Sequence, residues 1–128
     1  MTDLTSELAA RGQRVELVPA GPGSLAVVRL KDGRNVGRLE VMSGGPGELI
    51  AWELCIDKAE RGYGAGSEAA RLFVLAARKA GWTTIRARAR PQFGLSVYFW
   101  MRMGFRPLHG EGPDGGIWFV RRLAEGPA

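Results

Sequence analysis

Residues 54–66 read Leu-Cys-Ile-Asp-Lys-Ala-Glu-Arg-Gly-Tyr-Gly-Ala-Gly, and they run from a short apolar strand into a glycine-rich turn. The following stretch, Ser67 to Ala80, is predicted to be a helix. A helix start carries unpaired backbone N–H groups and the positive end of the helix dipole. Glycines let the backbone turn sharply and approach a ligand without a Cβ in the way. This order of elements therefore predicts an anion-binding turn, the kind most often used for phosphate groups.

Two other phosphate-binding patterns do not account for this turn. A P-loop requires Lys and then Ser or Thr after its last glycine, whereas Gly66 is followed by Ser67 and Glu68. A dinucleotide-binding fingerprint is formally present over 64–69, but it requires an acidic residue about 20 positions further on. Residues 85–88 read Ile-Arg-Ala-Arg instead, and several strand-like segments precede the turn. Both patterns are therefore disfavoured.

The composition predicts one domain with its own hydrophobic core. The chain has 128 residues, of which 45% are hydrophobic, and single domains commonly have about 100–150 residues. The sequence has no apolar run of about 18 residues and no signal-like start, so we expect a cytoplasmic protein that does not enter a membrane. The lone Cys55 excludes an internal disulfide and supplies no metal constellation, so no metal is expected.

Positive charge is concentrated in the half of the chain that follows the turn. Nine Lys or Arg residues and one acidic residue lie between Arg61 and Arg106, a net charge of +8 in a chain of +5. Such a bias favours the capture of a strongly anionic ligand such as a nucleotide cofactor. It would also suit nucleic acid, and charge alone does not separate the two.

Turn residues divide the chain into short alternating segments. Residues 1–12 are expected to be a short helix or partly disordered. The pattern predicts strands over 14–19, 25–30, 35–42, 48–56 and 83–90, helices over 67–80 and 95–103, and a terminal hairpin of 106–108 with 117–123. The three strands over 25–30, 35–42 and 48–56 should form an antiparallel meander, and the strand–turn–helix–strand unit should make two strands parallel neighbours. The fold class is therefore α/β, with a mixed, mostly antiparallel sheet flanked by helices.

Side-chain periodicity assigns faces to the helix and the strand that follow the turn. On the helix, the predicted core face is Ala69, Leu72, Phe73, Ala76 and Ala80, whereas Glu68, Arg71 and Arg78 should face solvent before Gly81 ends the helix. The strand over 83–90 alternates, which places Ile85, Ala87 and Ala89 on one face and Arg86, Arg88 and Arg90 on the other. It is therefore predicted to have one basic face.

The turn motif, Arg61-Gly62-Tyr63-Gly64-Ala65-Gly66, resembles the acetyl-CoA-binding segment of the GNAT superfamily of N-acetyltransferases, which reads Gln/Arg-x-x-Gly-x-Gly/Ala. Residues 99–105, Phe-Trp-Met-Arg-Met-Gly-Phe, resemble the second signature of that family, an aromatic-rich helix that ends in Gly-Phe. The resemblance covers roughly Ser24 to Leu123. It implies that residues 1–128 form a single GNAT-like acyl-CoA N-acyltransferase domain, with two central strands that splay apart around acetyl-CoA as co-substrate.

The resemblance also implies a set of cofactor-binding residues. The backbone N–H groups of the turn should bind the pyrophosphate, and a backbone amide of the preceding strand should polarise the acetyl carbonyl. These implied cofactor-binding residues are Arg61, Gly62, Tyr63, Gly64, Ala65, Gly66 and Ser67 for the pyrophosphate, Cys55 or Ile56 for the carbonyl, and Trp100 at the acetyl pocket.

Candidates for proton transfer are few. Glu53 is the first candidate for a general base and Glu48 the second, because both lie on or beside the strand that should line the cleft; ordered water is the alternative. Many relatives carry a proton-donating tyrosine four residues before the glycine of the Gly-Phe pair, but that position is Trp100 here. Tyr98 lies about 200° away around a helix, so it is a candidate donor only with a shifted register. His109 is expected in a surface loop.

The function predicted from these features is transfer of acetyl from acetyl-CoA to a primary amine of a small molecule or peptide, by direct attack in a ternary complex. A non-catalytic acyl-CoA-binding sensor is the first alternative, supported by Trp100 and by Phe93, which stands where the family often has Asn. A nucleic-acid-binding domain is the second, disfavoured because alanines rather than stacking aromatics separate the basic residues of the strand. The N-terminal region is short for the helices that relatives place there, so the acceptor cleft is open or is completed by a second subunit of a homodimer.

Overall fold

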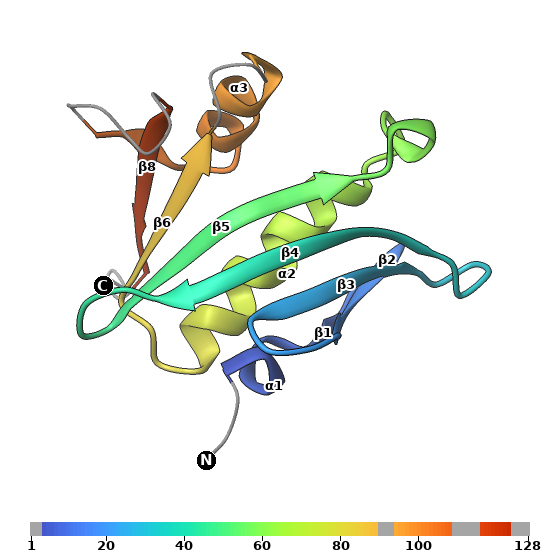
Figure 1. Cartoon of the computed structure of the whole chain (residues 1–128), viewed down its shortest axis with the longest axis horizontal. Coiled ribbons are helices and arrows are strands. Elements are labelled where there is room, and N and C mark those ends of the chain that lie inside the picture. The colour runs from blue at the N-terminus through green and yellow to red at the C-terminus, as the bar shows by residue number, and fades with distance from the viewer. Residues whose placement is uncertain (1–3, 90–93, 109–115, 124–128) are drawn as a thin grey trace.

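The computed structural model describes residues 4–89, 94–108 and 116–123, and these residues build one eight-stranded sheet with helices packed against it (Figure 1). The elements are α1 (Leu4–Leu8), β1 (Ala10–Arg11), β2 (Val15–Pro19), β3 (Ser24–Arg29), β4 (Asn35–Ser43), β5 (Glu48–Ile56), the 3-10 helix η1 (Lys58–Glu60), α2 (Ala65–Lys79), β6 (Thr84–Ala89), α3 (Gly94–Arg102), β7 (Arg106–Pro107) and β8 (Ile117–Arg122). The predicted α/β class with a mixed sheet is confirmed.

The strands lie in the order β1-β2-β3-β4-β5-β6-β8-β7. Every neighbouring pair is antiparallel except β5 and β6, which are parallel. The antiparallel meander predicted for the N-terminal half is confirmed, and so are the parallel pair and the terminal hairpin. The parallel pair is joined by a strand–helix–strand connection through α2, as expected for parallel neighbours.

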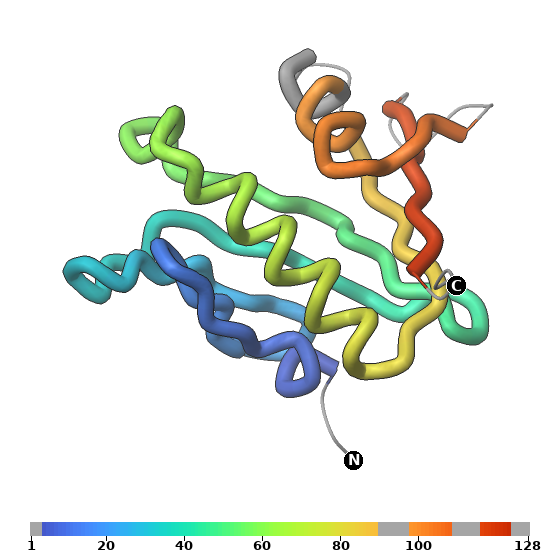
Figure 2. The backbone as a smooth tube through the Cα atoms, turned by 180° about the vertical axis from the view of Figure 1, so that it is seen from behind, coloured from blue at the N-terminus to red at the C-terminus, as the bar shows by residue number. Residues whose placement is uncertain are grey.

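Helix α2 crosses one face of the sheet and carries the main core (Figure 2). Its fully or nearly buried residues are Ala69, Ala70, Phe73, Val74 and Ala77. Ala69 and Phe73 were predicted, whereas Ala80 is exposed and Leu72 and Ala76 are only partly buried. Leu72 and Ala76 still pack against the core, so the predicted face is wrong only at Ala80, and it omits Ala70, Val74 and Ala77. Alanines lie on several sides of this helix, so periodicity alone does not select the side that meets the sheet.

Apolar residues from strands throughout the sheet belong to the same buried core as Phe73. Leu17, Leu25, Leu39, Leu49, Ile85 and Phe119 are fully buried in it. Burying a side chain of this size stabilises the fold by about 1.5–3 kcal/mol. In Figure 1 the opposite face of β2 to β5 carries no helix in the described part of the chain. The core therefore lies mainly between α2 and the sheet, and α1 and α3 add Leu8 and Trp100 to it.

Glycines end both long helices. Gly81, which follows α2, has φ +96°, and Gly104, which follows α3, has φ +88°, so both adopt the left-handed conformation that favours glycine. At Gly104 a Cβ would also lie 2.9 Å from Arg121 Nη1, which binds the Met103 carbonyl. The next residue, Phe105, packs on the Trp100 ring at 4.9 Å between centroids. The Gly-Phe pair therefore turns the chain and anchors α3.

Within the described ranges, no helix is both long and apolar enough to cross a membrane.

Candidate functional site

The two central strands pair at one end and separate at the other. β5 and β6 are in register from Glu48 opposite Thr84 to Ala51 opposite Ala87. Beyond Ala51, β5 continues to Ile56 and has no strand paired to its backbone on the β6 side in the described part of the chain, while β6 continues to pair with β8. Figure 1 shows the two strands diverging toward their C-terminal ends. The exposed edge of β5 can therefore hydrogen-bond an extended ligand.

Arg88 lies at the point where the strands separate. Its side chain is only 3% exposed, and its Nε donates to the Trp52 carbonyl at 3.0 Å. One of its Nη atoms also lies 3.2 Å from a carboxylate oxygen of Glu53. The guanidinium covers the Trp52 ring, 3.9 Å from its centroid. A residue predicted for a solvent-facing basic surface is therefore buried between β5 and β6, and alternation within one strand could not show this.

The glycine-rich turn joins the open end of β5 to α2. η1 follows the strand, Gly62 has φ +89°, and Gly64, with φ +85°, is the N-cap of α2. Among the described residues, none of the backbone N–H groups from Gly62 to Ser67 donates a hydrogen bond. Arg61 is exposed and donates from Nε to the Ile56 carbonyl at 2.9 Å. The turn therefore presents a run of backbone N–H groups beside the Arg61 guanidinium, and its binding of an anion stays a prediction.

Arg14 and Glu68, which the sequence did not indicate as site residues, connect the turn and the start of α2 to the N-terminal strands. Arg14 donates from Nη1 to the Tyr63 carbonyl at 2.9 Å. Glu68, predicted to face solvent, instead accepts from the N–H groups of Arg14 and Val15 at 2.6 and 2.9 Å. Burial tends to raise the pKa of Glu68, but the N–H groups of Val15, Arg14 and Gln13 outweigh it and hold that pKa below its ordinary value of 4.5. These contacts connect residues 49 to 54 positions apart, so local patterns could not reveal them.

Helix α3 comes close to the start of α2. A Cβ built on Gly66 would lie 3.4 Å from Ile56 Cγ1 and 3.8 Å from Phe99 Cε1. Phe99 in turn packs edge-on against Trp100, with ring centroids 5.1 Å apart. The end of β5, the start of α2 and the aromatic residues of α3 therefore meet around Gly66, and Phe99 is a candidate site residue that sequence reasoning missed.

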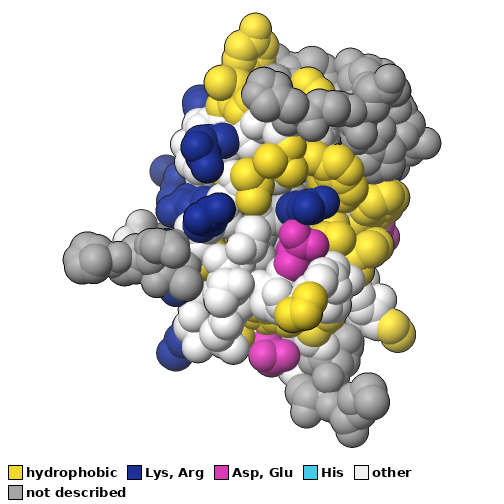
Figure 3. Space-filling view, turned by 90° about the vertical axis from the view of Figure 1, so that its left-hand side faces the viewer, with side chains coloured by type: hydrophobic (Ala, Val, Ile, Leu, Met, Phe, Trp, Pro, Cys, Tyr) yellow, Lys and Arg dark blue, Asp and Glu magenta, His cyan; other side chains and the backbone are white. Residues whose placement is uncertain are grey.

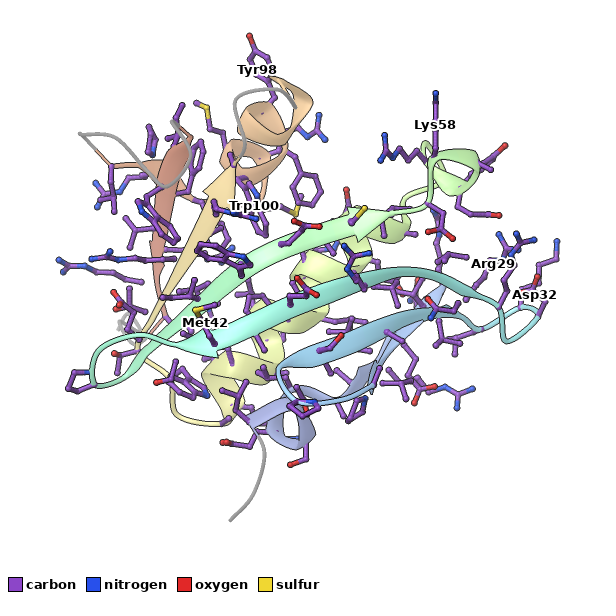
Figure 4. All side chains as sticks on the ribbon, viewed as in Figure 1. Arg29, Asp32, Met42, Lys58, Tyr98 and Trp100 are labelled. Atoms are coloured by element: carbon purple, nitrogen blue, oxygen red, sulfur yellow. The ribbon has the colours of Figure 1, made fainter. Side chains whose placement is uncertain are left out.

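The predicted catalytic residues have different surroundings. Glu53 is paired with Arg38 at 3.0 Å as well as with Arg88, and its side chain is 18% exposed. Tyr98 is 65% exposed and points away from the molecule, whereas Trp100 is 3% exposed on the inner side of α3 (Figure 4). The helix therefore keeps the register in which Trp100, not Tyr98, faces the strands. Cys55 is a half-buried free thiol on β5.

The basic face predicted for β6 does not exist as a free surface. Arg86 is paired with Glu48 at 2.8 Å and Arg88 is buried. Exposed cations on this side of the molecule come from β7 and β8 instead, at Arg106 and Arg122, and Figure 3 shows Lys and Arg side chains gathered there beside hydrophobic ones. The nucleic-acid-binding alternative depends on a basic face of Arg86, Arg88 and Arg90. Arg86 and Arg88 do not form such a face, because one is paired with Glu48 and the other is buried. Arg90, Phe93 and His109 lie outside the described residues.

The described residues contain no group of three or more His, Cys, Asp or Glu side chains placed to hold a metal ion.

Solved structures of acetyltransferases share this architecture. A GCN5-related N-acetyltransferase from Brucella melitensis matches with a TM-score of 0.75 at 17% identity, over 94% of this chain and 80% of that chain. An acetyltransferase from Thermus thermophilus matches with a TM-score of 0.65 at 24% identity, over 81% and 67%. The PaiA N-acetyltransferase from Thermoplasma acidophilum, in complex with coenzyme A, matches with a TM-score of 0.67 at 14% identity, over 77% and 59%. No family model and no curated protein sequence matches the chain.

Proposed function

The chain has the fold of the GNAT N-acetyltransferases, and we propose that it binds acetyl-CoA and transfers the acetyl group to a primary amine. The observation that carries the proposal is the continuous path from the unpaired edge of β5 into the free N–H groups of residues 62–67. The open strand edge suits the amide-containing arm of the cofactor, and the turn suits its pyrophosphate. A solved structure of the same fold contains coenzyme A.

Each part of the turn has a proposed role in holding the cofactor. The N–H groups of Gly62, Tyr63, Gly64, Ala65, Gly66 and Ser67 donate to the pyrophosphate, and Arg61 adds positive charge. Gly62 supports this role because a Cβ built there meets no atom within 4 Å, so the turn is open on that side. The net charge of +8 between Arg61 and Arg106 favours capture of the anionic nucleotide. Trp100 is proposed to contribute to the acetyl pocket from α3.

The proposed reaction is direct attack of the amine on the thioester. The amine nitrogen forms a new C–N bond to the carbonyl carbon, the C–S bond breaks, and its electron pair leaves with the sulfur. The amine loses one proton and the thiolate gains one. A backbone N–H of Cys55 or Ile56, on the edge of β5, would stabilise the negative charge that develops on the carbonyl oxygen.

The groups that move these protons remain predictions. Glu53 would accept the amine proton directly or through water, although two guanidinium groups already bind its carboxylate. Tyr98 would protonate the thiolate, although its side chain faces solvent in this register of α3. Tyr98→Phe separates the possibilities. A tenfold or larger fall in kcat supports Tyr98 as the donor, and an unchanged kcat contradicts it and favours solvent.

The burial of Trp100 keeps a second function open. An indole N–H donates a hydrogen bond but is far too weak an acid to protonate a thiolate. The second candidate function is therefore an acyl-CoA sensor that binds the cofactor through the same turn and does not transfer the acyl group. Tight acetyl-CoA binding without turnover over a broad amine panel would favour the sensor.

The experiment for the proposed function is a release assay for free CoA thiol. Purified protein is incubated with acetyl-CoA and a panel of small primary amines and peptides, and the free thiol is titrated over time. Acceptor-dependent thiol release, with the acetylated amine confirmed by mass spectrometry, supports the transferase. Binding of acetyl-CoA without acceptor-dependent release contradicts it and leaves the sensor.

A homodimer is a related proposal. The open face of β2 to β5 carries no helix in the part of the chain described (Figure 1), so a second copy could complete the acceptor side of the cleft. Sedimentation velocity tests this at assay concentration. A dimer supports the proposal, and a strict monomer that still turns over contradicts it.

A further inference from the structure

We propose that Arg88 is a positioning residue, which sets the gap between β5 and β6 where the arm of acetyl-CoA lies. This inference rests on the proposed function. The residue is not itself assigned to the reacting atoms. Its role is to hold the edge of β5 at a fixed distance from β6.

The strand register shows what Arg88 replaces. The last paired residues are Ala51 and Ala87, so the next step along both strands brings Trp52 opposite Arg88. At this step β5 and β6 are no longer paired through their backbones. The Arg88 side chain donates a hydrogen bond to the Trp52 carbonyl at 3.0 Å instead. Backbone hydrogen bonds hold neighbouring strands about 4.8 Å apart. A side chain that spans the same two strands allows them to separate while the carbonyl remains bonded.

The Arg88 guanidinium is buried and therefore depends on fixed partners. The Arg88 side chain is 3% exposed, so its charge is stabilised by partners rather than by bulk water. Described partners are the Trp52 carbonyl, the Glu53 carboxylate at 3.2 Å and the Trp52 ring at 3.9 Å. These three contacts all lie on β5. The guanidinium is therefore fixed against one short segment of that strand.

The same segment is where β5 is irregular. Glu40 of β4 pairs with Glu53, and Val41 pairs with Ala51, so Trp52 is the extra residue of a β-bulge. A bulge bends its strand and changes the direction of the following backbone groups. Arg88 binds both Trp52 and Glu53 at the bulge. It therefore positions the strand that follows, in which the N–H groups of Cys55 and Ile56 point alternately to β4 and to the cleft.

A neighbouring ion pair supplies a matched control. Arg86 is also on β6, two residues earlier, and pairs with Glu48 of β5 at 2.8 Å. That pair joins the strands where backbone bonds already hold them. Its arginine side chain is 41% exposed. Loss of the Arg86–Glu48 pair should therefore leave the gap between β5 and β6 unchanged. Like the Arg88–Glu53 pair, it joins an arginine of β6 to a glutamate of β5, so it is a matched control.

The test compares two ligands on three proteins by calorimetry. Wild type, Arg88→Lys and Arg86→Lys are titrated with acetyl-CoA and with 3′,5′-ADP, which lacks the pantetheine arm. Lysine keeps the charge but has no planar fork to reach a carbonyl and a carboxylate together. For Arg88→Lys we expect acetyl-CoA to bind about tenfold more weakly, about 1.4 kcal/mol, and 3′,5′-ADP to bind within twofold of wild type. Arg86→Lys should match wild type for both ligands.

Each other result overturns a distinct statement. Equal acetyl-CoA affinity in Arg88→Lys and wild type overturns the positioning role, and so does a parallel loss of both ligands in a folded variant. Failure of wild type to bind acetyl-CoA overturns the proposed function instead. If circular dichroism shows that Arg88→Lys is unfolded, Glu53→Gln takes its place, since it removes the carboxylate that fixes the guanidinium. Selective weakening of acetyl-CoA then supports the role, and unchanged binding overturns it.

Discussion

The Nε atom of Arg88 lies 3.0 Å from the carbonyl oxygen of Trp52, one step beyond the last backbone pairing of β5 with β6. One side chain thus joins two strands that otherwise part at this point. Beyond this contact, the unpaired edge of β5 leads directly into the glycine-rich turn at the start of α2, and together they form the proposed cofactor site.

Removal of the buried guanidinium should destabilise the fold. Arg88→Met leaves the Trp52 carbonyl without this donor and Glu53 with one cation fewer, so we expect the free energy of unfolding to fall by about 3 kcal/mol. Arg86→Met removes a half-exposed pair, and should cost less than about 1 kcal/mol. Urea unfolding measures both. Equal losses in the two variants would contradict the buried role of Arg88.

The two glycines at the start of α2 should respond differently to alanine. Gly64 has φ +85°, and a Cβ there would lie 2.6 Å from Arg14 Nη1, so Gly64→Ala should destabilise by about 1–2 kcal/mol. Gly66 has no positive φ, and a Cβ there would lie 3.4 Å from its nearest neighbour, an ordinary van der Waals contact. Gly66→Ala should therefore leave the free energy of unfolding unchanged or raise it by up to about 1 kcal/mol. Thermal unfolding compares them. A larger loss at Gly66 would show that the turn has another conformation.

Acid should weaken the attachment of the turn to the N-terminal strands. The pKa of Glu68 is lower in the fold than its ordinary value of 4.5, because N–H donors outweigh its burial. A depressed pKa contributes stability above the unfolded value, and this contribution is lost as the pH falls through the folded value. Unfolding free energies from about pH 7 down to about pH 3 should therefore decline less in Glu68→Gln than in wild type. Parallel profiles would contradict the assigned contacts.

Local sequence signals predicted the elements well where turn residues bound them. The strand predicted over 48–56 and β5 have the same ends, because a Gly-Pro-Gly turn precedes it and the glycine-rich turn closely follows it. The free N–H groups of that turn were also expected, since they follow from a helix start after glycines. The exposure of Tyr98 and the burial of Trp100 agree with their separation of about 200° around a helix.

Long-range contacts could not be predicted in the same way. Arg88 alternates with alanines as a solvent-facing residue would, and only the separation of β5 from β6 buries it. Glu68 looked like an exposed helix residue, yet its partners come from the first strands of the chain. The core face of α2 depended on which of several alanines meets the sheet, and that choice is made by packing rather than by periodicity.

The most direct measurement is calorimetric titration of acetyl-CoA into wild type, Ser67→Glu and Ser67→Gln. Ser67 lies in the first turn of α2, where a carboxylate favours the helix but repels a bound phosphate. The two variants have side chains of the same shape and differ in charge alone. We expect micromolar binding by wild type, and binding by Ser67→Glu at least tenfold weaker than by Ser67→Gln. Equal affinities of the two variants, or no binding by folded wild type, would contradict the assignment of this turn as the cofactor site.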